Sequence, residues 1–155
     1  MFKNYKDSHA FNIINKDILN NMLNHAYLLY GENAKVLMEM SLELAKHIVC
    51  FGEDKPCGTC VNCVKISNLT SPDLKVYPEK NQILKDDIIN IINDANIVPL
   101  ENNYKFYILN NIENATDNAL NKLLKTLEEP PQNSFLILQS AHPAQLLPTI
   151  LSRCQ

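Results

Sequence analysis

The 155-residue sequence predicts an α/β fold in which helices cover both faces of a parallel sheet. Short apolar runs alternate along the chain with longer segments of helical periodicity, as in strands joined by crossover helices. The apolar runs show little polar alternation, which is typical of strands buried on both faces. The segment Lys35 to Val49 is apolar over much of its surface, which indicates a helix packed between layers. Together these observations predict a three-layer α/β domain.

The first half of the chain supplies two of the expected strands. A short amphipathic helix is expected between Phe11 and Leu23, followed by a buried strand, Ala26–Tyr30, that ends at Gly31. After the long helix and a cysteine-rich loop, Val64–Leu69 has the length of one or two helical turns. The alternation in Asp73–Tyr77 predicts a half-exposed strand near a sheet edge.

The second half continues the alternation of helices and strands. The expected elements are a helix over Asp86–Ala95, a buried strand over Lys105–Leu109, a helix that begins after Asn114–Asp117 and stops at Pro130-Pro131, a strand over Phe135–Leu138, and a short helical turn over Ala144–Leu147 before Pro148. A ligand in such a fold is expected beyond the C-terminal ends of the strands. Two of these ends are the turn at Gly31 and Asn110-Asn111.

A cluster of four cysteines is the strongest chemical signal in the sequence. Cys57, Cys60 and Cys63 form a C-x-x-C-x-x-C run, and Cys50 stands one short loop upstream. Thiolates two residues apart can bind one side of a tetrahedral ion, and Gly58 allows a tight turn between them. Four ligands leave no open coordination position, so this spacing predicts a structural zinc site.

Other uses of these cysteines fit the sequence less well. Residues 1–7 are polar and lack the apolar segment of a signal peptide, so a reducing, cytoplasmic environment is expected and a disulfide is not. A redox C-x-x-C normally opens a helix just after a strand, whereas these cysteines lie in a polar loop. Four unrelated core cysteines would not be spaced so regularly.

Length and charge limit the possible functions. A chain of 155 residues is long enough for one domain with a hydrophobic core, and no apolar run approaches the length that spans a bilayer. The net charge of −3 and the lack of a basic block argue against a dedicated nucleic-acid surface.

Several phrases of the sequence resemble the ATPase-type (AAA+) domain of bacterial DNA polymerase III clamp-loader subunits. They are His25–Gly31, the cysteine cluster, Ser71–Leu74, Leu123–Pro131 and Leu147–Gln155, in the order that the family has them. The resemblance runs from Ala26 to the end of the chain and implies a P-loop NTPase-like fold with an inserted zinc module over residues 50–63. That family contains tau/gamma subunits, which hydrolyse ATP, and delta-prime subunits, which do not.

The resemblance places a P-loop between Gly31 and Cys50, but the residues needed there are missing. A P-loop requires glycines to present backbone N–H groups, a lysine for the phosphates and a hydroxyl for magnesium. The corresponding Gly-Lys-Ser/Thr positions are occupied by Val36, Leu37 and Met38. None of these side chains can bind a phosphate or a metal, so no ATP is expected as a cofactor.

The second half of an ATP site is also altered. After the strand over residues 105–109, active members have an acidic pair that binds Mg²⁺ and orients the attacking water. Here the pair is Asn110-Asn111, and an amide is a weak metal ligand and no base. Glu113 lies close in sequence but beyond the strand end. Two losses in one site indicate the non-hydrolysing, delta-prime type.

One catalytic motif of the family is retained. Ser152-Arg153-Cys154 matches the motif whose arginine reaches across a subunit interface to the ATP of a neighbour. The resemblance therefore implies that Arg153 is an arginine finger, with Ser152 in the same motif. Cys154 is expected to be a small buried residue or part of the final strand, and not a zinc ligand.

The expected role is that of a nucleotide-free subunit of a ring that loads the sliding clamp in DNA replication. Its implied partners are tau/gamma and delta subunits, with indirect contact to the clamp, with DNA only inside the complex, and with no membrane. Residues 1–155 would be the N-terminal AAA+-like domain, the family's lid and collar would follow, and a last strand would begin near Gln155. The alternatives are an ATP-hydrolysing tau/gamma-like subunit and a zinc-containing nucleic-acid-binding module.

Overall fold

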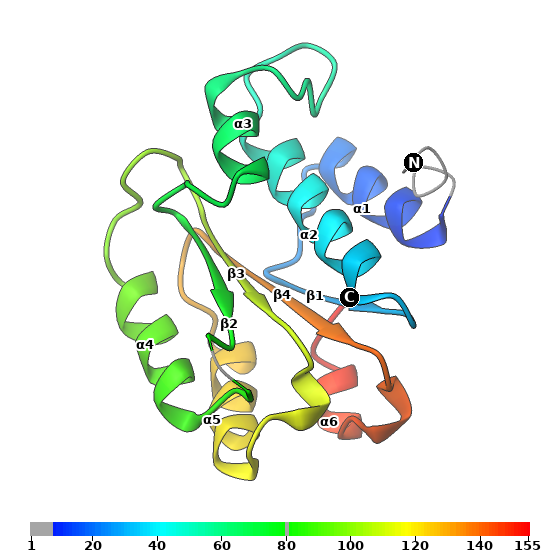
Figure 1. The fold of residues 1–155 in the computed structure, drawn as a ribbon, viewed down its shortest axis with the longest axis vertical. Helices are drawn as coiled ribbons and strands as arrows, with labels where there is room; N and C mark the ends of the chain where they lie inside the picture. The colour runs from blue at the N-terminus through cyan, green and yellow to red at the C-terminus, as the bar shows by residue number, and fades with distance from the viewer. Residues whose placement is uncertain (1–7, 80) are drawn as a thin grey trace.

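A parallel sheet forms the centre of the structure, a computed structural model that describes residues 8–79 and 81–155. Within these residues the sheet has the strand order β1-β4-β3-β2, and every neighbouring pair is parallel (Figure 1). The strands are β1 (Ala26–Tyr30), β2 (Leu74–Tyr77), β3 (Lys105–Leu109) and β4 (Ser134–Ser140). The predicted α/β fold with a parallel sheet is confirmed. The polar segment 1–7, on which the expected compartment rests, lies outside the described residues.

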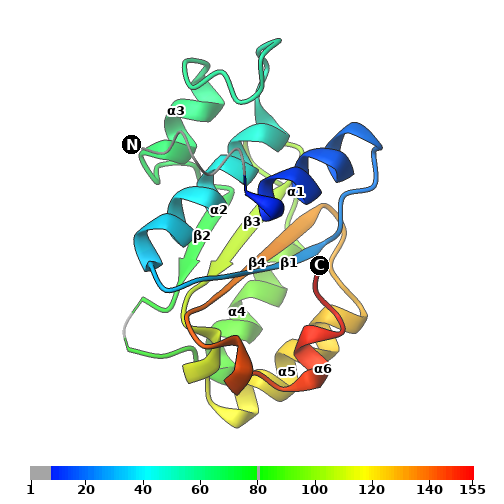
Figure 2. The same cartoon turned by 90° about the vertical axis from the view of Figure 1, so that its right-hand side faces the viewer.

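Helices cover both faces of the sheet, as the sequence predicts. They are α1 (His9–Leu19), α2 (Ala34–Val49), α3 (Val61–Ser67), α4 (Lys85–Ala95), α5 (Asp117–Glu128) and α6 (Pro148–Leu151), with 3-10 turns at Ile112–Asn114 and Pro143–Gln145. Figures 1 and 2 show α1, α2 and α3 on one side of the sheet and α4, α5 and α6 on the other. None of these helices is both long and apolar enough to cross a bilayer.

Two apolar cores fill the spaces between the three layers. Successive strand side chains point to opposite faces, so Phe106 and Ile108 of β3 pack toward α2, whereas Tyr107 and Leu109 pack toward α4 and α5. All five residues of β3 are buried, which explains the absence of polar alternation in this strand. By contrast, β2 lies at the sheet edge and is only partly buried, as its alternating sequence predicts.

Several helix boundaries differ from the sequence prediction; α3, for example, begins at Val61 and not at Val64. Helix α1 begins at His9, where the Ser8 hydroxyl accepts a hydrogen bond from the Phe11 amide, and ends at Leu19 because Asn21 adopts a left-handed conformation with φ of 58°. The short helical turn expected before Pro148 is found at Pro143–Gln145, and Pro148 opens a further short helix, α6, that the sequence analysis does not predict. Proline is favourable in a first helical turn, where its missing N–H group has no intrahelical partner.

The end of the chain pairs with the free edge of β1. The Gln155 amide donates to the Ala26 carbonyl at 3.1 Å, and the Leu28 amide donates to the Gln155 carbonyl at 3.1 Å. This exchange is the hydrogen-bond pattern of a parallel pair. It agrees with the expectation that a last strand begins near Gln155.

Candidate functional site

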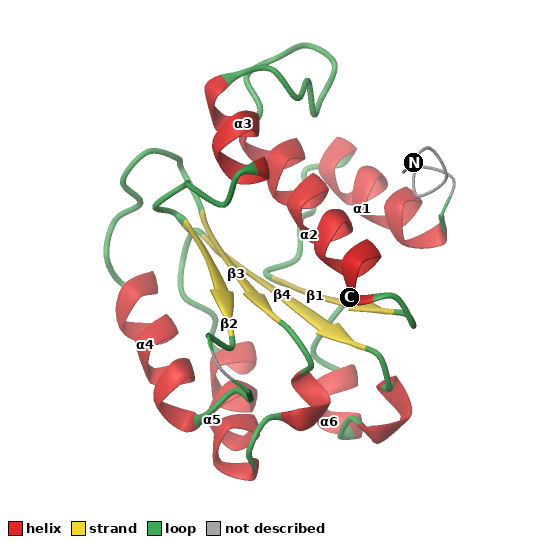
Figure 3. Cartoon of the chain, viewed as in Figure 1, coloured by secondary structure: helices red, strands yellow, loops and turns green. Residues whose placement is uncertain are grey.

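The four predicted zinc ligands meet at one point. The Sγ atoms of Cys50, Cys57, Cys60 and Cys63 all lie within 4.8 Å of one another. Cys50 follows α2 directly, Cys60 is the N-cap of α3 and Cys63 lies in its first turn, so two helix ends bring the thiols together. The loop between them projects beyond α3 at the end of the molecule (Figure 3).

Backbone amides surround these sulfur atoms. Cys50 Sγ accepts hydrogen bonds from the amides of Gly52 at 3.2 Å and Cys57 at 3.3 Å, and Cys57 Sγ accepts one from the Cys60 amide at 3.3 Å. The Thr59 backbone and hydroxyl lower the pKa of Cys57 to about 5, and the Cys63 amide lowers the pKa of Cys60. N–H donors favour the thiolate form, which is the form that binds metal.

Burial acts in the opposite direction on Cys63. Its side chain is fully buried, and desolvation raises the pKa of its thiol to about 12. A buried thiol next to other sulfur atoms ionises only when a cation compensates the charge. The cluster therefore combines two thiols whose pKa is lowered with one whose pKa is raised by burial and which requires a metal for ionisation.

The donor set fits a four-coordinate metal ion. The Sγ atoms lie within 4.8 Å of one another, which is close to the spacing of roughly 3.8 Å that four sulfur atoms have in a tetrahedral zinc site. Gly58 has φ of +74° in the tight turn, and a Cβ at Gly52 would lie 2.7 Å from the Cβ of Cys57. Both glycines are thus needed for the loop to fold around the sulfur atoms.

Side chains outside the cysteine set attach this loop to the rest of the domain. The Asn62 amide donates a 2.9 Å hydrogen bond to the Val49 carbonyl, one of the last carbonyls of α2. On the outer side, Lys65 of α3 forms a 2.6 Å ion pair with Glu101. Asp73 holds the loop that contains Glu101. Its carboxylate accepts hydrogen bonds from the backbone amides of Leu100, Glu101 and Asn102, all at 2.8 Å.

A second candidate site lies at the C-terminal ends of β1, β3 and β4. A pocket of about 270 Å³, called here the strand-end pocket, is lined by Ala34, Lys35, Leu37, Met38, Asn110, Asn111, Gln139, Ser140 and Ala141. The structure therefore brings together two of the three predicted P-loop positions, Leu37 and Met38, and the Asn110-Asn111 pair, which lie far apart in sequence, whereas Val36 does not line the pocket. This is the place where a parallel α/β sheet is expected to bind a ligand.

The N-terminus of α2 faces this pocket with its amides already bonded. Asn33 is the N-cap, and its side-chain oxygen accepts hydrogen bonds from the amides of Lys35 at 3.0 Å and Val36 at 3.3 Å. These are the groups that a phosphate would otherwise bind at a helix N-terminus. Leu37 is 6% exposed and belongs to the core between α2 and the sheet.

Apart from Lys35, the polar side chains that line the pocket are neutral. Gln139 donates to the Ser41 hydroxyl at 2.6 Å, and that hydroxyl donates to the Leu37 carbonyl at 2.9 Å. Asn110 Oδ1 is buried and accepts no hydrogen bond from the described residues. Glu113, the nearest carboxylate in sequence, accepts the Ala141 amide at 3.3 Å and lies in the turn after β3. An uncharged amide at the strand end is a poorer Mg²⁺ ligand than a carboxylate.

Arg153 does not line the strand-end pocket. It follows α6, and its guanidinium binds Glu128 at the end of α5, with Nη2 and Oε1 2.5 Å apart. Ser152 lies beside it and accepts a hydrogen bond from Arg153 Nη1 at 3.3 Å. Cys154 lies away from the four clustered cysteines and packs partly buried against the core, as predicted.

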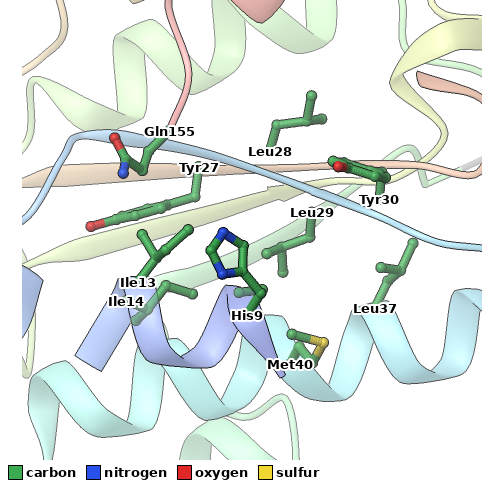
Figure 4. Close-up of a pocket in the computed structure, with 11 residues that line it drawn as sticks. His9, Ile13, Ile14, Tyr27, Leu28, Leu29, Tyr30, Leu37, Met40 and Gln155 are labelled. Carbon is green, nitrogen blue, oxygen red and sulfur yellow. The ribbon is translucent and has the colours of Figure 1, made fainter. Parts of the chain in front are cut away.

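An additional pocket of about 450 Å³ lies between α1, α2 and the free edge of β1. Figure 4 shows mainly apolar side chains converging on it, with Ile13 from α1, Met40 from α2 and Leu29 from β1. Leu37 lines both this pocket and the strand-end pocket. Apart from Leu37, the pocket contains none of the site residues that the sequence predicts.

Sequence reasoning missed three residues that shape these sites. Asn33 could have been found, because an asparagine directly before a helical segment is a typical N-cap. Asn62 carries no sequence signal for its bond to Val49. Glu128 carries no sequence signal for its pairing with Arg153, which joins positions 25 residues apart.

Comparison with known families agrees with this architecture. Residues 6–155 match the model of the family described as DNA polymerase III, delta subunit. A delta-prime subunit of DNA polymerase III from Bacillus subtilis is 38% identical over 94% of this chain, and one from Haemophilus influenzae is 36% identical over 84%. The tau subunit from Bacillus subtilis is 31% identical over 95% of this chain.

The chain covers less than half of each of these relatives. It spans 44% of the Bacillus subtilis delta-prime protein, 41% of the Haemophilus influenzae one and 26% of the tau subunit. The similarity therefore describes the part of those proteins that this chain matches.

Solved structures show the same fold. A DNA polymerase III gamma subunit-related protein from Thermotoga maritima superposes with a TM-score of 0.70 at 28% identity, covering 96% of this chain and 44% of that one. The RuvB branch migration motor of the same organism superposes over 99% of this chain and 43% of its own with a TM-score of 0.56 at 12% identity, which supports the AAA+ fold alone. With the family match over residues 6–155, these findings show that the chain belongs to the DNA polymerase III delta-subunit family.

Proposed function

We propose that this chain acts in a DNA polymerase III clamp loader as a subunit that neither binds nor hydrolyses ATP and that supplies Arg153 to the ATP site of a neighbouring subunit. The observation that carries the proposal is the composition of the strand-end pocket. Leu37 and Asn110 stand where phosphate and metal ligands are needed, and Asn33 occupies the amides of α2. The retained Ser152-Arg153-Cys154 motif supports a role toward the ATP of another subunit.

The metal is proposed to be zinc, with a structural role. Four cysteine ligands complete a tetrahedral site and leave no position for a substrate or a water nucleophile. The hydrogen bond from Asn62 to Val49 supports a role in bracing the end of α2. Residues 50–63 would then form a module inserted in an AAA+-like domain over residues 1–155.

The proposed partners are the tau/gamma and delta subunits, because the relatives are subunits of DNA polymerase III. Contact with the sliding clamp would be indirect, and contact with DNA would occur only within the assembled loader. A net charge of −3 speaks against independent DNA binding. A cytoplasmic location follows from a role in replication.

Two measurements test this function. Titration of a fluorescent ATP analogue against the purified chain is expected to show no saturable binding up to millimolar concentration. In a loader reconstituted with this subunit, Arg153→Ala is expected to lower kcat of ATP hydrolysis by at least tenfold with little change in KM, because an arginine finger acts on transition-state charge. Unchanged hydrolysis would contradict the arginine assignment.

A tau/gamma-like, ATP-hydrolysing subunit is the second candidate. The 31% identity to a tau subunit over 95% of this chain favours it, as does the open strand-end pocket of about 270 Å³. It requires ATP to displace the Asn33 contacts from the start of α2. Saturable binding of the ATP analogue with Mg²⁺ would support this candidate over the first.

A further inference from the structure

The guanidinium of Arg153 is almost fully hydrogen-bonded within its own chain. Nε and Nη2 donate to Glu128 Oε1 at 3.1 and 2.5 Å, and Nη1 donates to the Thr149 carbonyl at 2.8 Å and to the Ser152 hydroxyl at 3.3 Å. These contacts use four of the five N–H groups of the side chain. One N–H of Nη2 is left to bind anything else.

The partners of the guanidinium come from two helix ends that the fold places together. Glu128 is the last residue of α5, and the chain turns away at Pro130. Thr149 lies in the four-residue helix α6, whose last carbonyls have no partner within so short a helix. The Thr149 carbonyl accepts both the Ser152 hydroxyl, at 3.1 Å, and the Arg153 guanidinium. These acceptors together bind the Arg153 guanidinium within the chain. The ion pair still reaches solvent, because the Arg153 side chain is 31% exposed and that of Glu128 is 51% exposed.

We infer that Glu128 is a restraining residue for Arg153: its carboxylate holds and neutralises the guanidinium, and Arg153 acts on a neighbour's ATP only after this ion pair opens. The inference rests on the proposed function of Arg153. A guanidinium that already binds a carboxylate has neither the charge nor the free donors to stabilise a phosphoryl group in transit. The carboxylate itself would repel the phosphates if it stayed beside them.

The ion pair is suited to reversible opening. Both side chains reach solvent, and exposed pairs are weak and screened by salt. A polyphosphate carries more negative charge than one carboxylate and can accept the same N–H groups, so it can compete for the guanidinium once a subunit interface brings it close. Glu128 therefore sets how readily hydrolysis occurs before the loader is fully assembled on its substrates.

Removal of the carboxylate charge tests this inference in a loader reconstituted with this subunit and assayed without clamp or DNA. Glu128→Gln is expected to raise ATP hydrolysis about two- to fivefold, the factor that corresponds to losing a weak exposed ion pair. The variant Glu129→Gln removes the same charge one residue further along and is the matched control, with hydrolysis expected at the wild-type rate. The double variant Glu128→Gln/Arg153→Ala is expected to match Arg153→Ala alone, since the glutamate acts through the arginine.

A second readout uses the purified chain without ATP. Solvent exchange of the Arg153 Nε–H proton, followed by NMR, is expected to be about two- to fivefold faster in Glu128→Gln than in wild type or Glu129→Gln. Wild-type or lower hydrolysis in Glu128→Gln, with Arg153→Ala still impaired, would overturn the inference and leave the proposed function standing. Unchanged hydrolysis in Arg153→Ala would refute the proposed function and the inference with it.

Discussion

The carboxylate of Glu128 and the guanidinium of Arg153 form an ion pair of 2.5 Å between the end of α5 and the residue that follows α6 by two positions. The pair connects two phrases of the sequence, Leu-Glu-Glu-Pro-Pro and Ser-Arg-Cys. Glu128 and Arg153 are 25 residues apart along the chain. The arginine motif is thus part of a local polar network on the surface. The strand-end pocket and the cysteine cluster are separate from it.

The metal site gives the first prediction. Purified chain is expected to contain one equivalent of zinc, and Cys63→Ser is expected to lower the metal content to well under half of that because it removes a fully buried ligand. Metal analysis by mass spectrometry measures this content directly. Cys154→Ser is the matched control, since Cys154 lies outside the cluster, and it should retain the full equivalent. A metal-free wild-type protein purified without chelator would disprove the zinc assignment.

Acidification should release the metal. Amide donors hold the pKa of Cys57 at about 5, below its ordinary value, so the thiolate is present above that pH and is protonated as the pH falls through it. Protons then compete with the metal for its ligands. Metal retention after buffer exchange is expected to be complete at pH 7 and to fall as the buffer approaches pH 4. Full retention at pH 4 would contradict the prediction.

The core position of Leu37 should make a phosphate-binding lysine hard to introduce there. Leu37→Lys is expected to destabilise the fold by about 2–4 kcal/mol, because a cation replaces a leucine that is 6% exposed. It should not create ATP binding, since Asn33 still occupies the α2 amides. Urea denaturation measures the stability, and Lys35→Leu, at an exposed neighbouring position, is the control with an effect within about 0.5 kcal/mol. Equal effects of the two variants would show that Leu37 does not pack as described.

The hydrogen bond between Asn62 and Val49 should couple the cysteine loop to α2. Asn62→Ala leaves a buried carbonyl without its 2.9 Å donor and is expected to cost about 1–3 kcal/mol. Hydrogen exchange is expected to become faster in residues 46–63 and to stay unchanged in α4. Asn90→Ala, an exposed asparagine on α4, is the control and should alter neither quantity. A stability change without faster exchange near the cysteines would argue against the coupling.

Asp94 should make the stability of the fold depend on pH in the acid range. Burial tends to raise its pKa, but hydrogen bonds from Lys75 and Tyr107 and the charges of Lys75 and Lys105 outweigh burial and lower the pKa below its ordinary value. A lowered folded-state pKa means that the stabilisation is present above the unfolded-state value of about 3.8 and is lost as pH falls through the folded-state pKa.

The matched variant for this effect is Asp94→Asn. It is expected to be less stable than wild type by about 1–3 kcal/mol at pH 7, because Lys105 is buried and loses its carboxylate partner. The two proteins should converge in stability below about pH 3. Denaturation curves from pH 7 to pH 2.5 test this, and a difference that stayed constant over the range would contradict it.

Much of the fold follows from local sequence patterns. The apolar runs at Ala26–Tyr30 and Lys105–Leu109 coincide with β1 and β3, because a fully buried strand has no reason to alternate. Boundaries were less predictable where a single backbone conformation decides them, as at Asn21 after α1. Helix α6 was not predicted, although Pro148 is favourable in its first turn, because four residues are too few to show a helical period.

The candidate sites were likewise predictable from the sequence only in part. The cysteine spacing predicts a metal site from sequence alone, because all four ligands lie within one short segment. The resemblance to clamp-loader subunits locates the altered P-loop at Val36 to Met38 by counting from Gly31 to Cys50. Neither source of information could say that Asn33 bonds the α2 amides or that Leu37 is part of the core.

By itself the sequence predicted the parallel α/β class and a four-cysteine metal site, since each depends on residue type and short-range spacing, and the resemblance to clamp-loader subunits implied the loss of phosphate- and magnesium-binding residues. Only the tertiary structure decided that Gln139 bonds Ser41, that Asn62 bonds Val49 and that Glu128 holds Arg153. These contacts join residues brought together by chain folding. Their existence depends on side-chain positions that no local periodicity encodes.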